Sequence, residues 1–133
     1  MADLLKFSIP GKPEYVGVVR LAVSSAANCA GFSMEAIEDI KVAVSEACTN
    51  VVQHGAQDGN CYEVECRIES DKLIILVTDL CGGYDTEKYL EPCIEKPKES
   101  GLGIFIIRAL MDEVDILSTL GVGTKIQMVK YLL

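Results

Sequence analysis

The run Ile40-Lys-Val-Ala-Val-Ser-Glu-Ala-Cys-Thr-Asn-Val-Val-Gln-His54 decides how this chain folds. Its apolar residues recur at helical spacing, so the run predicts a long helix with one buried face. Glu46 and Asn50 are four residues apart and therefore project from one side of that helix. A carboxylate can accept a proton from a hydroxyl nucleophile, and an amide oxygen can bind Mg²⁺ without adding charge. The pair suits phosphoryl transfer, but by itself it also fits an ordinary solvated helix surface.

Before this run, the sequence predicts a strand and a first helix. Residues 4–9 are typical of a short strand, and Pro13 opens a helix that ends near Ala30, with Gly31 as its stop. Ser33 is expected to cap the central helix, which ends near His54. The apolar positions expected on the first helix are Tyr15, Val18, Val19, Ala22, Val23 and Ala26. The core stripe expected on the central helix is Ile37, Ile40, Val44, Ala47 and Val51.

After the central helix, the period-two alternation of residues 62–69 and the more apolar residues 73–78 predict a hairpin. Residues 81–100 are irregular and too long for an ordinary connection, so we expect a functional loop there. An apolar helix is expected from Ile104 to about Met111, and two strands at 114–118 and 125–131 close the chain.

The expected element order is β-α-α-β-β-loop-α-β-β. Adjacent strand pairs favour a mixed, mostly antiparallel sheet, and the long helices would cover one face of it. The predicted fold class is therefore a two-layer α/β (α+β) sandwich. At 133 residues, we expect one domain over residues 1–133.

Composition limits the classes of partner and site. The net charge of −8 disfavours nucleic acid and favours a basic protein partner, although it also fits a role in solubility alone. With no basic, apolar leader and no apolar run long enough for a membrane span, we expect a soluble cytoplasmic protein. Six cysteines without a C-x-x-C pair and a single histidine indicate neither a zinc site nor a disulfide framework.

Two further segments have residues suited to nucleotide binding. Asp79 ends the predicted buried strand and precedes Leu80-Cys-Gly-Gly83, where a carboxylate could accept a hydrogen bond from adenine beside permissive glycines. Ser100-Gly-Leu-Gly103 leads into the predicted third helix, and free amides at a helix start bind phosphate. Each segment alone is compatible with a plain turn or a glycine-rich helix entry.

Taken in order, these segments resemble the N, G1 and G2 boxes of the GHKL ATPase superfamily, which binds ATP in the Bergerat fold. Within it the chain most resembles the RsbW type of bacterial anti-sigma factors, which are serine-protein kinases. The similar stretches are Pro13-Glu-Tyr-Val-Gly17, Glu38-Asp-Ile-Lys-Val-Ala-Val-Ser-Glu-Ala-Cys-Thr-Asn50, Gly101-Leu-Gly-Ile-Phe105 and Leu110-Met-Asp-Glu-Val114. The resemblance extends over nearly the whole chain.

This resemblance implies a role for each matching residue. Glu46 would be the general base toward a substrate serine, and Asn50 would hold Mg²⁺ against the phosphates of ATP. Asp79 would bind the adenine amino group with Gly83 against the base, and Thr124 would support the adenine end. Residues 85–100 would form a lid over ATP. The residues expected to hold phosphate oxygens are Ser100, Gly101, Leu102 and Gly103.

The resemblance also implies partners. The substrate would be an anti-anti-sigma protein of the STAS type, and the same kinase, as a homodimer, would sequester an alternative sigma factor in a stress response. Exposed Arg20 on the first helix corresponds to the family's partner-binding region. Direct contact with nucleic acid or membrane is not expected. Two alternatives are a nucleotide-responsive binding module with little kinase activity and a stressosome-type switch kinase, whose N box usually has arginine where this chain has Thr49.

Two positions depart from the family pattern. The usual Asp-x-Gly-x-Gly is here Asp79-Leu-Cys-Gly-Gly83, so Cys81 replaces the first glycine. Some relatives have a basic residue where this chain has Glu99, which leaves Lys96 or Lys98 as the candidate to neutralise phosphate.

Overall fold

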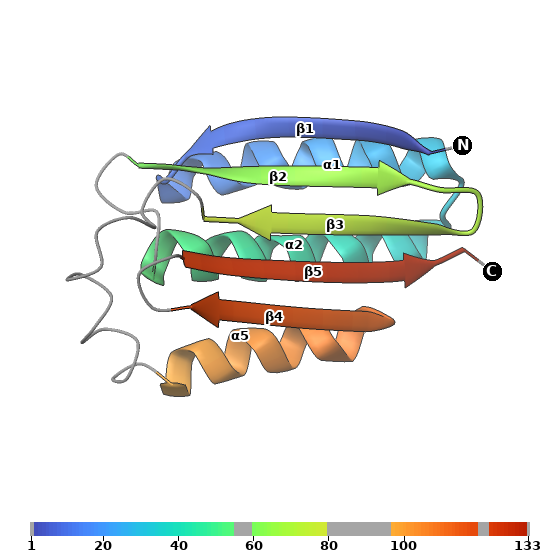
Figure 1. The fold of residues 1–133 in the computed structure, drawn as a ribbon. Helices are drawn as coiled ribbons and strands as arrows, with labels where there is room; N and C mark the ends of the chain where they lie inside the picture. The colour runs from blue at the N-terminus through green and yellow to red at the C-terminus, as the bar shows by residue number, and fades with distance from the viewer. Residues whose placement is uncertain (1, 55–59, 80–96, 120–122, 133) are drawn as a thin grey trace.

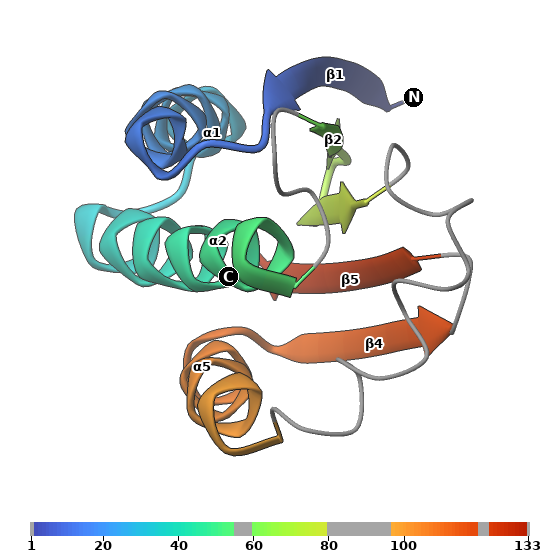
Figure 2. The same ribbon diagram turned by 90° about the vertical axis from the view of Figure 1, so that its left-hand side faces the viewer.

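One antiparallel sheet forms the first layer of the molecule, and helices cover one of its faces (Figures 1 and 2). The computed structural model describes residues 2–54, 60–79, 97–119 and 123–132, without the side chains of residues 54, 97–101, 118 and 119. The observed element order and the two-layer arrangement confirm the predicted fold class.

The sheet has five strands in the order β1-β2-β3-β5-β4, and every pairing among them is antiparallel. The sequence left a mixed sheet open, and no parallel pair occurs among these strands. The strands are β1 (Asp3–Pro10), β2 (Cys61–Ile68), β3 (Lys72–Thr78), β4 (Glu113–Thr119) and β5 (Gly123–Tyr131).

The helical layer consists of α1 (Val16–Ala30), α2 (Met34–His54) and α5 (Pro97–Leu110), with a short 3-10 turn, η1 (Pro13–Tyr15), before α1. Helix α2 lies between the other two and contacts both (Figure 2). Its expected stripe is confirmed, because Ile37, Ile40, Val44, Ala47 and Val51 are all buried. They join the inward side chains of the central strands, including Val64, Leu73, Ile75, Val77 and Ile126, in one core.

The predicted helix boundaries between α1 and α2 are confirmed. Gly31 ends α1 with a φ of +99°, a left-handed conformation that glycine adopts without strain. The Ser33 hydroxyl accepts a hydrogen bond from the amide of Ala36 at 3.2 Å, which caps the start of α2.

One helical prediction needs correction, and one face needed the structure to assign. Of the apolar residues that the sequence placed at helical spacing here, Val19, Val23 and Ala26 on α1 are buried, whereas Tyr15 in η1 and Val18 and Ala22 on α1 are exposed. An apolar residue on a helix can face either the core or solvent, and helical periodicity alone does not show which of the two it faces. Helix α5 begins at Pro97 and not at Ile104, since proline is well suited to a first helical turn.

The cysteines also differ from expectation at one position. Cys61, at the start of β2, is disulfide-bonded, while Cys29, Cys48 and Cys66 are free thiols. The sequence contained no signal for this bond, because disulfide pairing depends on spatial proximity and not on spacing.

Two of the free thiols are buried in the core. Desolvation raises the pKa of the Cys48 thiol to about 12. The Tyr62 hydroxyl has a weaker effect that lowers this pKa, and Cys66 raises it by a small amount. Desolvation also raises the pKa of the Cys66 thiol to about 11, assisted by nearby Glu65. Both thiols therefore stay protonated in the folded protein at pH values where they ionise in the unfolded chain.

This difference predicts that stability falls above about pH 9. In that range the native state binds more protons than the unfolded state, so the free energy of unfolding should fall by up to about 1.4 kcal/mol per pH unit for each thiol. Urea unfolding followed by circular dichroism between pH 8 and 11 measures the slope. Cys48→Ala should flatten it and Cys29→Ala, at an exposed position, should not. An unchanged slope in Cys48→Ala would contradict this account.

Candidate functional site

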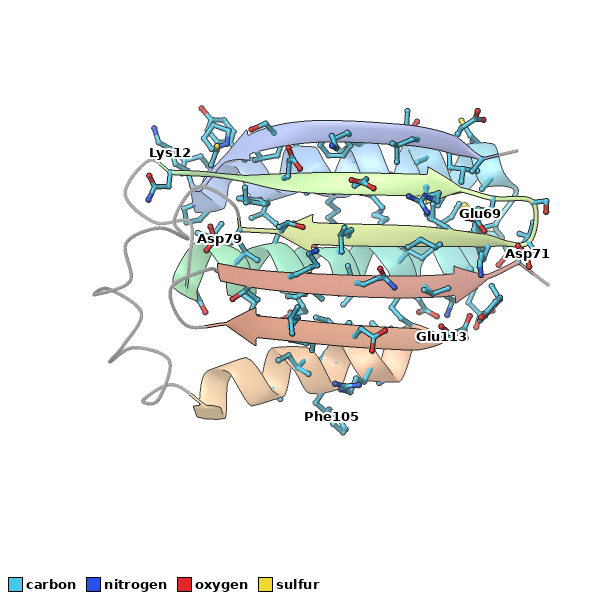
Figure 3. All side chains as sticks on the ribbon, in the orientation of Figure 1. Lys12, Glu69, Asp71, Asp79, Phe105 and Glu113 are labelled. Atoms are coloured by element: carbon cyan, nitrogen blue, oxygen red, sulfur yellow. The ribbon has the colours of Figure 1, made fainter. Side chains whose placement is uncertain are left out.

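Four segments that are distant in sequence meet at one end of the molecule. The last turns of α2, the end of β3, the start of β5 and the start of α5 all lie at the end opposite the two chain termini (Figure 1). Asp79 marks this end of the sheet in Figure 3. The antiparallel pairing of β3 with β5 requires that the end of one lies beside the start of the other.

Helix α2 places Glu46 and Asn50 near this end. The two side chains are half-buried, and one helical turn, or about 6 Å of rise, separates their backbone positions. Thr49, between them in sequence, is exposed. Burial of the α2 stripe fixes the rotation of the helix, so Glu46 and Asn50 stand at the margin of the core and remain accessible.

Helix α5 brings Gly103 against Glu46. A Cβ atom built on Gly103 would lie 3.1 Å from Oε1 of Glu46, a closer approach than most real side chains make. The N-box carboxylate and the G2-box glycine, 57 positions apart in the printed sequence, are therefore direct neighbours. Their convergence was expected from the resemblance, and the structure brings this pair together.

The end of β3 brings Asp79 to Thr124. Asp79 is 1% exposed and is the only buried charged or polar residue in the described part of the chain. Its amide donates a hydrogen bond to the carbonyl oxygen of Thr124 at 2.9 Å, which continues the β3–β5 ladder by one residue. A carboxylate is costly to bury, so the buried Asp79 at the end of β3 is a candidate functional residue.

Gly123 is a residue whose role the sequence analysis missed. It has a φ of +128°, and a Cβ atom on it would overlap the carbonyl oxygen of Asp79 and approach Oδ2 to 3.7 Å. Only glycine lets β5 start this close to Asp79. The one sequence signal was the glycine directly before Thr124, which is common to many turns.

The remaining expected site residues are placed differently. Ser100, Gly101, Leu102 and Gly103 lie inside α5 and do not precede it, since the helix already begins at Pro97. The Leu102 side chain is 65% exposed. In this helix the amides of residues 101–103 lie beyond the first turn. Contrary to the prediction, they are therefore not free hydrogen-bond donors. Gly83 and Lys96 lie outside the described residues, and so does the side chain of Lys98.

Known proteins resemble this chain over nearly its whole length. Residues 9–130 match the model of the histidine kinase-like ATPase domain family. A serine-protein kinase RsbW of Oceanobacillus iheyensis is 44% identical over an alignment that covers 98% of this chain and 87% of the relative. The RsbW kinases of Bacillus subtilis and Listeria innocua are 36% and 41% identical, with 98% and 99% of this chain covered and 87% and 89% of the relatives. The chain belongs to the RsbW family of serine-protein kinases.

A solved structure supports the fold of this RsbW-family kinase. The histidine kinase domain of the Erythrobacter litoralis EL346 blue-light activated histidine kinase matches with a TM-score of 0.55 at 23% identity. The match covers 91% of this chain and 60% of that one. This likeness shows a shared fold, and the match of residues 9–130 to the histidine kinase-like ATPase domain family indicates that the nucleotide is ATP.

In the described part of the chain, no group of three or more His, Cys, Asp or Glu side chains could hold a metal ion. The donor set nevertheless fits Mg²⁺ brought by a nucleotide, since Mg²⁺ keeps several waters and takes few protein ligands beside phosphate oxygens. Asn50 offers one neutral oxygen for that purpose. Separately, none of the described helices has the length and apolarity needed to cross a membrane.

Gly123→Ala should weaken ATP binding as well as stability. The substitution combines about 1–3 kcal/mol of backbone strain with a clash against the Asp79 backbone, which must shift the adjacent carboxylate. Gly31→Ala is a matched control, because Gly31 also has positive φ but has nothing within 4 Å of an added Cβ. Calorimetric titration with ATP and thermal unfolding separate the effects. Wild-type ATP affinity in Gly123→Ala would rule out this role.

Proposed function

We propose that this protein is an ATP-dependent protein serine kinase that phosphorylates an anti-anti-sigma protein and sequesters an alternative RNA polymerase sigma factor. Residues 1–133 would act as one GHKL-type ATPase domain. The observation that best supports the proposal is the contact between Glu46 on α2 and Gly103 on α5, at the same end of the molecule as Asp79 and Thr124.

In the proposed reaction Glu46 accepts the proton of a substrate serine hydroxyl. The serine oxygen forms a bond to the γ-phosphorus of ATP, while the bond from that phosphorus to the β,γ-bridging oxygen breaks. The products are phosphoserine, ADP and a proton held by Glu46. Phosphoryl transfer depends mainly on positioning and charge stabilisation, so one base on a rigid helix is sufficient protein chemistry.

Asn50 is the residue proposed to hold Mg²⁺, through its amide oxygen. Bound there, the ion would neutralise phosphate charge. Asp79 and Thr124 are proposed to hold the adenine end together with Gly83, because a buried carboxylate can accept a hydrogen bond from the exocyclic amine. Glu46 and Asn50 follow one another along α2, so the phosphate end and the base would lie on the same helix face.

The proposed phosphate contacts require a local change in α5. The amides of Gly101, Leu102 and Gly103 can donate to phosphate oxygens only if the first turn of the helix, residues 97–100, unwinds or shifts. Ser100 would then lie at the helix start, where its hydroxyl could cap the free amides. Lys96 or Lys98 remains the proposed source of positive charge at the γ-phosphate.

Glu46→Ala should retain ATP binding and lose most serine phosphorylation. General-base assistance is typically worth about 10²–10⁴ in rate, so a fall of at least about 100-fold is expected. The assay uses radiolabelled ATP with the cognate anti-anti-sigma protein, and titration calorimetry checks nucleotide affinity. Glu38→Ala is the control, since Glu38 is exposed on α2 and pairs with Lys41 at 3.1 Å. An undiminished rate in Glu46→Ala would refute the assignment.

Asn50→Ala should remove the dependence of ATP affinity on magnesium. Loss of one ligand oxygen is expected to cost about 1–3 kcal/mol, or roughly 5- to 150-fold in affinity for MgATP, with little change in EDTA. Thr49→Ala, at the neighbouring exposed position, serves as the control. Equal magnesium dependence in Asn50→Ala and in the wild type would exclude Asn50 as the ligand.

The partner surface is proposed to include α1. Its outward side exposes Arg20 together with Val18 and Leu21, which are 54% and 69% exposed. An apolar patch beside a cation is suited to a protein partner. The acidic net charge of −8 is compatible with a basic sigma factor, and such a partner would place the protein in the cytoplasm.

We also propose that the protein forms a homodimer and that its kinase activity is substantial. The second candidate function, a nucleotide-responsive binding module with little kinase activity, is less favoured because Glu46 is present and next to the α5 glycine. A pull-down of sigma and anti-anti-sigma proteins with ATP and with ADP, combined with the mass of the free protein by light scattering, tests both points.

A further inference from the structure

We propose that Gly103 is a positioning residue for the general base, and that its missing side chain provides the space in which the Glu46 carboxylate lies. This inference rests on the proposed function, in which Glu46 accepts the serine proton. It assigns to Gly103 a task separate from any hydrogen bond that its amide makes to phosphate.

The contact that carries this inference is specific. Among the described residues, apart from the two chain neighbours of Gly103 and the helix's own backbone within four residues, the only heavy atom within 4 Å of a Cβ on Gly103 is Oε1 of Glu46, at 3.1 Å. A methyl group there would therefore press on the proposed catalytic carboxylate and on no other residue of this set. Ordinary contact begins at about 3.4 Å, so one of the two groups must move.

The backbone gives no other reason for glycine at this position. Gly103 lies in the interior of α5, and the described glycines with positive φ are Gly31 and Gly123. Alanine would adopt the same helical conformation and is among the best helix formers, whereas glycine is among the poorest. Glycine at position 103 thus makes the helix less stable. Its lack of a side chain leaves space for the Glu46 carboxylate, which we propose is the reason for glycine here.

The orientation of α5 agrees with this reading. Phe105 is 69% exposed and projects away from the sheet on the outer side of the helix (Figure 3). Residues two apart in a helix point in nearly opposite directions, so Gly103 lies on the side that faces α2. The α2–α5 packing therefore brings the backbone of α5 against the carboxylate.

A displaced Glu46 should reduce catalysis without reducing nucleotide binding. With an added methyl group at 103, the half-buried Glu46 carboxylate must give way by a few tenths of an ångström. Because a misplacement of about 1 Å can cost roughly 100-fold in rate, this smaller displacement should also lower the rate measurably. The amide of an alanine at 103 remains a donor, so an effect on phosphate binding is not expected.

The test is Gly103→Ala in the full chain, with three readouts. Thermal unfolding should give an unchanged or higher midpoint, and the Kd for MgATP by calorimetry should stay within about twofold of the wild type. The rate of single-turnover phosphorylation of the cognate anti-anti-sigma protein, with radiolabelled ATP, should fall about 10- to 100-fold.

Two further variants separate positioning from general effects on the helix. Ala109→Gly, at an exposed position of the same helix, should lower the unfolding midpoint and leave the phosphorylation rate unchanged. Glu46→Asp withdraws the carboxylate by one methylene from the position of the added methyl. Gly103→Ala should therefore cost less in rate in the Glu46→Asp background than in the wild type, and this coupling can be measured as a double-mutant cycle.

Each other outcome overturns the inference. An unchanged rate in Gly103→Ala means that the methyl group is accommodated, and a raised Kd means that the glycine serves phosphate. A lowered midpoint with lost activity means general packing, as do additive effects with Glu46→Asp. Failure of the proposed function is distinguishable, because Glu46→Ala would then phosphorylate at the wild-type rate.

Discussion

Burial of the apolar face of α2 against the sheet is the constraint on which the rest of the structure depends. The helix has one stripe of core residues, and filling the core with it leaves no freedom to rotate. Glu46 and Asn50 are thereby fixed at the margin of the core, where a side chain is held by its surroundings and can still reach a ligand. The same helix contacts α1 and α5, so it joins the proposed partner surface to the proposed phosphate end.

Antiparallel topology explains why the site is at one end. The end of β3 and the start of β5 are neighbours in the ladder, and the amide of Asp79 extends that ladder to Thr124. Helix α5 begins at the same end and packs against the last turns of α2 (Figure 1). The residues proposed for the base and the metal, on α2, therefore share one end of the molecule with those proposed for the adenine end, on β3 and β5.

Two carboxylates of the site each lie against a glycine. Glu46 is next to Gly103, and Asp79 is next to Gly123, whose positive φ and lack of a Cβ allow the close approach. At Gly103 the glycine makes α5 less stable, because glycine costs about 0.5–1 kcal/mol relative to alanine in a helix interior, whereas the positive φ of Gly123 favours glycine over alanine. Space beside an acidic group is thus a recurring feature of this site.

The sequence by itself determined the element order, the layers, the α2 stripe, the Gly31 and Ser33 helix boundaries and the choice of Glu46, Asn50, Asp79 and Thr124 as site candidates. These features follow from periodicity, local turn chemistry and the motif resemblance, which act over a few residues. Tertiary structure alone decided which face of α1 is exposed, that α5 starts at Pro97, that Cys61 forms a disulfide, and that Gly103 and Gly123 make room for Glu46 and Asp79. Those outcomes depend on distances between atoms far apart in the chain, and such distances are set only when the helices pack on the sheet.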